Sequence, residues 1–332
     1  MRRALPLPLP LPLPPSLAAP LGAAALLIAL ATPAVVSAAS SRERAASCCD
    51  LSGEDVAQDA TPVGEIPGVQ VLHDIAYGKA PLQRFDVYKP AQAKGAPLLI
   101  LVHGGGWRFG DKAHRAVVEN KVARWVTKGF VVVSVNYRLL PDTPVARQVE
   151  DVAQAIAAAQ KQAAGWGAER GLTVLMGHSA GAHLVALLAA ASDSLAKLDV
   201  TPAQGVVLLD SAALDVPAIM NMRHLPLYDR AFGKDPLHWR ELSPLHVLDA
   251  QGPAVLAVCS SRREQACPQA QAFAKAAELG GRAVQVLPED LSHREINTEL
   301  GRESAYTRAV ETFMAGLDPR LAERIRGAPA SP

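Results

Sequence analysis

The sequence is poor in cysteine, in aromatic residues and in net charge. Only 4 of its 332 residues are cysteine, and none of these has the Cys-x-x-Cys spacing of a zinc or redox site. Aromatic residues make up 5% of the chain, and 33 Lys and Arg residues against 32 Asp and Glu residues give a net charge of +1. Because a nucleic-acid-binding protein needs a basic surface, this charge balance argues against that class of protein.

The chain does have enough apolar residues to build a large core. Its composition is 49% hydrophobic and 20% charged, which excludes global disorder. The length fits one large α/β domain or two modest domains.

Residues 1–38 differ in composition from the rest, with 8 of the 26 prolines and no acidic residue. A basic start, an apolar run and small residues up to Ala38 are typical of a secretory signal peptide. We therefore predict cleavage near Ala38, with an uncleaved membrane anchor and a lipoprotein site at Cys48 as the alternatives.

Cleavage would remove two arginines and leave a net charge of −1. No later stretch has the length and apolarity of a membrane-spanning helix. We therefore predict a periplasmic or secreted protein whose residues 39–67 form a poorly ordered lead-in.

Short apolar runs alternate with longer helical patterns along the rest of the chain. The runs, which predict strands, are 69–77, 84–88, 97–102, 130–135, 172–176, 205–210, 255–260 and 283–287. One helical pattern begins after Pro144, and others occupy about 113–128, 181–191, 267–280 and 302–316. This alternation predicts one α/β domain over 68–318, built on a mostly parallel eight-stranded sheet with helices on both faces.

Two segments do not fit the alternation. Residues 211–248 carry scattered aromatic and methionine residues, and we expect them to form a cap-like insertion above the sheet. We assign residues 319–332 to a tail that follows the domain.

The four cysteines, which all lie beyond Ala38, would meet oxidising conditions in an exported protein. Three pairings of the four are possible, and free thiols are the alternative. We favour a disulfide between Cys259 and Cys267, because it would close a short loop just after a predicted strand.

A candidate nucleophile lies where a predicted strand meets a predicted helix. Gly177–Gly181 has the pattern Gly-x-Ser-x-Gly, which holds a serine on a sharp, strained turn and exposes its hydroxyl. The N–H groups at the start of the following helix point toward developing negative charge. We predict Ser179 as the nucleophile.

A glycine-rich segment, His103–Trp107, directly follows the predicted buried strand 97–102. Its exposed N–H groups suit an oxyanion hole formed by Gly105, Gly106 and the N–H of Ala180. A phosphate-binding turn is the alternative, although the chain has neither of the phosphate-binding patterns Gly-x-Gly-x-x-Gly and Gly-x-x-x-x-Gly-Lys-Ser/Thr here. Trp107 either lines the substrate pocket or packs the loop.

A serine on a Gly-x-Ser-x-Gly turn works with an acid and a histidine, which occur along the chain in the order serine, acid, histidine. The histidine, as general base, should therefore follow the last strand. His293 comes six residues after the predicted strand 283–287, and no histidine lies beyond it. We predict His293 as the base.

The acid should lie in the loop after the strand that ends near residue 260. Glu264 is the only carboxylate there, and Asp210, at the end of the preceding strand, is the alternative acid. A solvated Glu264 beside two arginines is a third interpretation. We favour Glu264 over Asp210.

Together these segments resemble the α/β-hydrolase fold, in the carboxylesterase branch with a His-Gly-Gly-Gly oxyanion loop. The resemblance is carried by Phe85–Pro90, His103–Trp107, Gly110–Lys112, Tyr137–Leu139 and Gly177–Gly181. It is nearest to the bacterial feruloyl-esterase-like, or BD-FAE-like, subgroup, which borders the hormone-sensitive-lipase-like and arylformamidase groups.

The chain departs from that subgroup at the acid. Members usually carry an Asp or Glu after the penultimate strand, where this sequence has Arg262 and Arg263. Glu264 follows them directly.

The resemblance implies a serine carboxylesterase that hydrolyses a small-molecule ester through an acyl-enzyme, with neither a metal nor an organic cofactor. An arylformamidase-type amidase is the nearest alternative, because the same residues would serve a formamide. A catalytically silent hydrolase fold used for binding is an alternative of another class.

Overall fold

The computed structural model describes residues 64–191, 195 and 197–327. The chain divides into two units, Met1–Ser40 and Ser41–Pro332, and the described residues all belong to the second. The predicted signal peptide, its alternatives at the N-terminus and most of the predicted lead-in lie outside the described residues.

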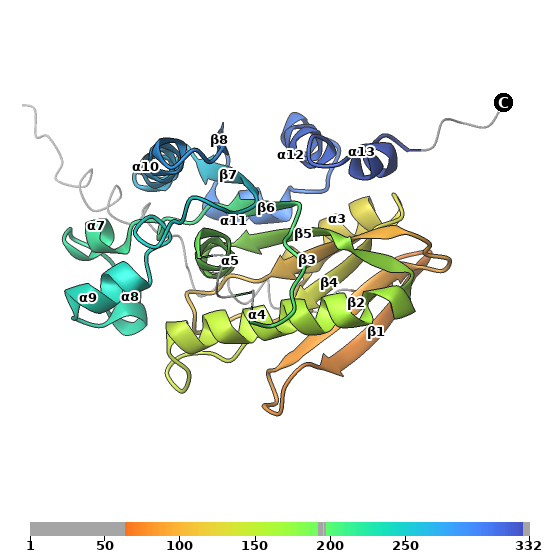
Figure 1. Ribbon diagram of the computed structural model, residues 1–332, viewed down its shortest axis with the longest axis horizontal. Coiled ribbons are helices and arrows are strands. Elements are labelled where there is room, and N and C mark those ends of the chain that lie inside the picture. The colour runs from red at the N-terminus through yellow and green to blue at the C-terminus, as the bar shows by residue number, and fades with distance from the viewer. Residues whose placement is uncertain (1–63, 192–194, 196, 328–332) are drawn as a thin grey trace, which may run out of the picture. The chain divides into compact units, whose positions relative to one another are not determined.

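The domain is built on one eight-stranded sheet with the order β1-β2-β4-β3-β5-β6-β7-β8 (Figure 1). The strands are β1 (Val69–Ala76), β2 (Arg84–Pro90), β3 (Ala96–Val102), β4 (Val131–Val135), β5 (Ala168–His178), β6 (Gly205–Leu209), β7 (Ala254–Ser260) and β8 (Val284–Glu289). Strand β2 is antiparallel to β1 and β4, and the pairings from β4 to β8 are all parallel. The predicted fold class is confirmed.

Helices cover both faces of the sheet, and the central strands are buried accordingly. All seven residues of β3 and all five of β4 are buried, as their continuous apolar runs predict. Successive β3 residues enter different cores, with Ile100 on one face and Leu99 on the other. The first core includes α4 (Val145–Gln162), α5 (Ala180–Ala190) and α10 (Ala266–Leu279). The second includes α3 (Arg115–Val126), α11 (His293–Thr298), α12 (Ala305–Ala315) and α13 (Pro319–Arg326).

Residues 211–248 contain three short helices. They are α7 (Val216–Met220), α8 (Pro226–Phe232) and α9 (Pro236–Glu241), which lie together at the left of Figure 1. Asp215 and Asp235 cap α7 and α9, and each of the three helices has proline in its first turn. These caps and prolines explain why the segment breaks the alternation of strands and helices.

The segment set apart as a tail begins with a packed helix. Asp318 caps α13, and Leu321, Ala322 and Ile325 are buried on its inner face. Because the helix is only eight residues long and rich in arginine, its apolar stripe is hard to see in the sequence.

The predicted disulfide between Cys259 and Cys267 is present, and it closes the loop between β7 and α10. Closing a loop of this size removes freedom from the unfolded chain. We expect the double variant Cys259→Ala/Cys267→Ala to lose about 2–3 kcal/mol of unfolding free energy. Urea unfolding of the variant and of the oxidised wild type measures this difference, and an unchanged free energy of unfolding would contradict it.

Candidate active site

Ser179 lies on a sharp turn between β5 and α5. Its backbone, at φ 54° and ψ −117°, is strained for a residue with a side chain. The flanking glycines make the turn possible: a Cβ on Gly177 would lie 2.4 Å from the carbonyl oxygen of Gly181, and one on Gly181 would lie 2.3 Å from that of Val102. The sequence therefore holds the serine hydroxyl above the carboxyl end of the sheet.

His293 connects Ser179 to Asp210. Its Nε2 lies 2.9 Å from Ser179 Oγ, and its Nδ1 lies 2.6 Å from Asp210 Oδ2. The histidine begins α11, whose N-terminus is fixed by a capping box between Ser292 and Glu295. The ring of His178 adds a hydrogen bond from Nε2 to the carbonyl oxygen of His293, at 3.0 Å.

Asp210 follows β6, is fully buried and has a φ of 56°. Its Oδ1 accepts the N–H of Ser260 at 2.8 Å, and its Oδ2 accepts Nη1 of Arg263 at 2.7 Å. Although burial opposes ionisation, the hydrogen bond from His293 and the charge of Arg263 hold the pKa of Asp210 well below its usual range. Asp210 is therefore a carboxylate.

The structure corrects the preferred acid. Glu264 is exposed, whereas His293 Nδ1 contacts Asp210, the alternative acid. The preference for Glu264 is wrong because the buried carboxylate comes one strand earlier in the sheet. In the loop after β7, the residue that reaches His293 is Arg263, with Nη1 3.1 Å from Nδ1.

The glycine-rich segment 103–107 lies beside the serine. A Cβ on Gly105, at φ 112°, would lie 2.2 Å from the carbonyl oxygen of Phe109, whereas one on Gly106 would meet open space. His103 anchors the loop through its carbonyl oxygen, which accepts the Tyr137 hydroxyl at 3.0 Å. Burial lowers the pKa of His103 to about 4, so its ring is neutral.

A narrow pocket opens over the serine. Gly106 and Ala180, two of the three predicted oxyanion donors, line it together with Ser179 and His293. The volume of the pocket is about 30 Å³. Its other described lining residues are Trp107, Ser211, Ala212, Ala213, Leu227, Tyr228 and Arg263. The segment 211–248 therefore contributes to the walls of the pocket through α8 and the chain just before α7.

Trp107 both lines this pocket and packs the loop, so the two alternatives for it are combined. Its ring contacts Phe232 and Tyr228 of α8, with centroids 5.0 and 6.0 Å away. Its Nε1 donates to Nδ1 of buried His183 at 3.2 Å, and His183 Nε2 donates to the carbonyl oxygen of Leu242 at 2.8 Å. Burial lowers the pKa of His183 to about 4, so a neutral imidazole joins the glycine-rich loop to the chain just after α9.

We expect His183→Leu to destabilise the domain. Leucine leaves the Trp107 N–H and the Leu242 carbonyl group without partners in a buried site, and each loss costs about 1–3 kcal/mol. A decrease of about 2–4 kcal/mol in the free energy of unfolding should follow, measured by urea denaturation. A value within about 0.5 kcal/mol of wild type, the effect of an ordinary surface change, would contradict this role for His183.

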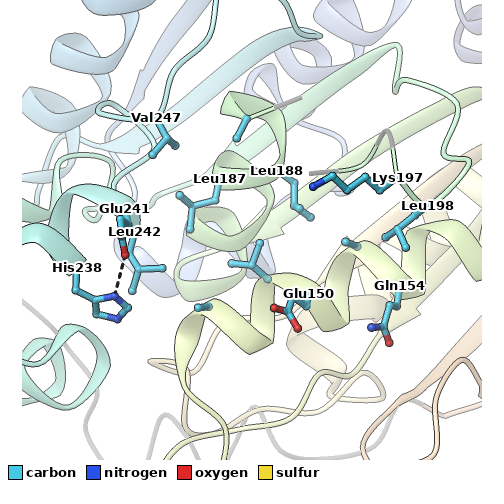
Figure 2. Close-up of a pocket in the computed structure, with 14 residues that line it drawn as sticks. Glu150, Gln154, Leu187, Leu188, Lys197, Leu198, His238, Glu241, Leu242 and Val247 are labelled. Carbon is cyan, nitrogen blue, oxygen red and sulfur yellow. Dashed lines mark ion pairs between the residues drawn. The ribbon is translucent and has the colours of Figure 1, made fainter. Parts of the chain in front are cut away.

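A second cavity, of about 450 Å³, lies between α4, α5 and the segment around α9. Figure 2 shows apolar side chains such as Leu187, Leu188 and Leu242 around it, with the ion pair of His238 and Glu241 at one side. None of the described residues that line it is a serine or a cysteine. Of the two pockets, the smaller one therefore holds the serine and the histidine that acyl transfer needs.

Three other histidines, all within 211–248, have carboxylate partners of their own. His224 and His246 contact Asp229 and Asp215, and His238 faces Glu241. Among the residues that the structure describes, no three His, Cys, Asp or Glu side chains form a metal-binding group, and no helix is long and apolar enough to cross a membrane.

Comparisons with known proteins match the chain to a family model and to several hydrolases. The BD-FAE family model matches residues 85–224. A kynurenine formamidase from Danio rerio is 31% identical over 231 residues, which cover 68% of this chain and 74% of the relative. Esterase LipC of Mycobacterium tuberculosis is 28% identical over 232 residues, which cover 64% of this chain and 57% of that esterase. An isoprenylcysteine alpha-carbonyl methylesterase of Arabidopsis thaliana is 33% identical over 118 residues, 35% of this chain and 27% of its own length.

Solved structures share the fold. Esterase B of Lactobacillus rhamnosis superposes with a TM-score of 0.64 and 21% identity, over 85% of this chain and 96% of that protein. Esterase 2 of Thermogutta terrifontis, phosphonylated by sarin, gives a TM-score of 0.62 and 22% identity, over 76% and 96% of the two chains.

The sheet order and the serine–histidine–aspartate arrangement define the class of α/β-hydrolases. Within that class, the chain belongs to the BD-FAE-like family, as the family model and the relative with 31% identity establish. It is accordingly a serine hydrolase of the carboxylic ester hydrolase type.

Proposed function

We propose that the chain is an exported esterase that hydrolyses small carboxylic esters through an acyl-enzyme on Ser179. One observation carries the proposal: His293 lies 2.9 Å from Ser179 Oγ through Nε2 and 2.6 Å from Asp210 through Nδ1. A base within hydrogen-bond reach of a nucleophile, and oriented by a carboxylate, is the arrangement that activates serine.

In the first step, Ser179 Oγ attacks the ester carbonyl carbon while its proton moves to His293 Nε2. The negative charge that develops on the carbonyl oxygen is stabilised by the N–H groups of Gly106 and Ala180, with Gly105 beside them. His293 then gives the proton to the leaving alcohol, and the bond between the carbonyl carbon and that alcohol breaks. The products of this step are a free alcohol and an acyl group on Ser179.

In the second step, a water molecule loses a proton to His293 Nε2 and attacks the acyl-enzyme. The carbon–Oγ bond breaks, the proton returns to Ser179 and a carboxylic acid leaves. Asp210 stays ionised throughout and stabilises the imidazolium at each step. The buried, hydrogen-bonded position of Asp210 supports this role.

The narrow pocket supports small substrates. Trp107, Leu227 and Tyr228 form apolar walls close to Ser179, so a short acyl group fits more readily than a long chain. We expect kcat/KM for p-nitrophenyl esters to fall by about tenfold or more between acetate and octanoate. A tenfold fall corresponds to about 1.4 kcal/mol of lost transition-state stabilisation. Rates that rise steadily with chain length would contradict this assignment of the pocket.

A formamidase is the second candidate, and the kynurenine formamidase relative favours it. The same residues can attack a formyl group, because His293 can protonate a leaving amine as it does an alcohol. Turnover of short p-nitrophenyl esters and of N-formylkynurenine by one enzyme preparation separates the two. We expect the higher kcat/KM with the ester, and a formamide value about ten times higher would establish the alternative.

Export rests on the basic and apolar start of the chain and on the disulfide between Cys259 and Cys267. Sequencing the N-terminus of the protein purified from its native host tests it. A start near residue 39 is expected, and an intact Met1 would support the uncleaved alternative.

A further inference from the structure

Arg263, in the loop after β7, lies against both the acid and the base of the site. Its Nη1 is 2.7 Å from Asp210 Oδ2, 3.0 Å from the Asp210 carbonyl oxygen and 3.1 Å from His293 Nδ1. Only 9% of its side chain is exposed. We propose, on the basis of the function proposed above, that Arg263 is a positioning residue: it fixes the Asp210 carboxylate and keeps His293 neutral between turnovers.

The hydrogen-bond pattern supports the first half of the proposal. Asp210 Oδ2 is shared by two donors, His293 Nδ1 and Arg263 Nη1, while Oδ1 accepts the N–H of Ser260. A guanidinium can only donate, so it cannot replace Asp210 as the partner of the protonated Nδ1. It binds the same oxygen, Oδ2, beside the histidine and leaves the 2.6 Å contact with His293 intact.

The same geometry decides which proton form of His293 is useful. If Nδ1 accepted a hydrogen bond from Arg263, the single proton of the neutral ring would be on Nε2. Nε2 faces Ser179 and could then not accept the serine proton. The short contact with the ionised Asp210 favours the proton on Nδ1 instead. Nη1 then donates to Asp210, and its 3.1 Å approach to His293 becomes a repulsive contact when the ring is charged.

Charge balance supports the second half of the proposal. Without Arg263, His293 would face an uncompensated carboxylate, which favours the imidazolium form even without substrate. With it, Asp210 and Arg263 form an ion pair, so the ring meets little net charge. Burial and the charge of Arg263 lower the pKa of His293, while Asp210 acts in the opposite direction.

Other ionisable groups near His293 do not replace this pair. His178 of β5, 4.5 Å away between ring centroids, is kept neutral because burial lowers its pKa, and burial raises the pKa of Tyr306 of α12. On the exposed side, Arg262 pairs with Asp290 after β8 and with Glu295 of α11. Further out, Lys121 of α3 acts electrostatically on His178, Glu289 of β8 acts on Tyr306, and Arg294 of α11 directly follows His293 in the chain.

The loop that carries Arg263 is closed covalently. Cys259 and Cys267 bracket it, and it supplies two of the donors to Asp210, the N–H of Ser260 and Nη1 of Arg263. The disulfide therefore limits how far these two donors can move away from the carboxylate.

The test is the pH profile of kcat/KM for p-nitrophenyl acetate between about pH 4 and 9. For the wild type, we expect the acidic limb below about pH 6.5, the usual pKa of histidine. In Arg263→Gln, the limb should move up by about one pH unit or more, because a neighbouring positive charge is lost. Glu264→Gln is the matched control: it removes one charge from the adjacent exposed residue and should leave the profile unchanged. Arg263→Lys, which keeps the charge, should return the limb toward the wild-type position.

Three results would overturn the proposal. The first is an Arg263→Gln enzyme whose activity falls equally at every pH, which indicates a purely structural role. The second is an Arg263→Lys limb that moves as far as that of Arg263→Gln. The third is a wild-type limb at or above about pH 6.5, which decides the matter even if the variants do not fold. Failure of the proposed function looks different, because the wild type would then show no activity above that of Ser179→Ala at any pH.

Discussion

Asp210→Asn is expected to lower kcat/KM for short esters on the order of 10⁴-fold. An asparagine fits the same space but carries no charge, so it can no longer stabilise the imidazolium or fix the proton on Nδ1 of His293. The loss should be severe here because Arg263, 3.1 Å from that nitrogen, would remain without its counter-ion. Initial rates measured at the optimum pH give the ratio.

Glu264→Gln is the matched control for that experiment. Glu264 lies three residues before Cys267 in the same loop but is exposed, so its loss should change kcat/KM by less than about twofold, in keeping with a surface substitution. The opposite pattern, with Asp210→Asn active and Glu264→Gln impaired, would show that the loop rearranges in solution to present Glu264.

Ser179→Ala is expected to lower kcat on the order of 10⁶-fold. The variant should keep the fold, because the strained turn depends on Gly177 and Gly181 and alanine has almost the same backbone limits as serine. Circular dichroism and the urea midpoint check folding, and initial rates at high enzyme concentration measure the residual activity. More than about 1% of wild-type kcat would show that another group is the nucleophile, and an inactive wild type would favour the silent binding protein.

The sequence predicts most of the sheet and, at the site, both the nucleophile and the base. The apolar run 97–102 corresponds to the buried strand β3, and Gly177–Gly181 forms the expected turn between strand and helix. His293 could be singled out because it follows the last strand. These features are local, since a buried strand or a tight glycine turn leaves a pattern in consecutive residues.

The acid could not be chosen in this way, because its identity depends on which of two loops reaches His293. Asp210 and Glu264 both follow predicted strands, and only the packing of β6 against β7 brings Ser260 and Arg263 around Asp210. One feature of the sequence does favour Asp210: it directly follows a fully apolar strand. A carboxylate buried at that position needs a hydrogen-bonding or charged partner. Arg263 was visible as a departure from the family pattern, but its role as that partner was not.

The contacts between the glycine-rich loop and the helices of 211–248 were also not visible. Trp107, His183 and Leu242 are separated by 59 or more positions, yet a chain of two hydrogen bonds joins them. Sequence patterns assign His183 no role. Long-range contacts of this kind follow from the tertiary fold and have no counterpart in periodicity.

The most direct test of the proposed mechanism is the mass of the enzyme after reaction with a fluorophosphonate ester. We expect one adduct per chain, located on Ser179 by peptide mapping, formed more slowly as His293 becomes protonated and absent in Ser179→Ala. An adduct on another residue, or no adduct with a folded wild-type protein, would contradict the proposal that Ser179 is a nucleophile activated by His293 and Asp210.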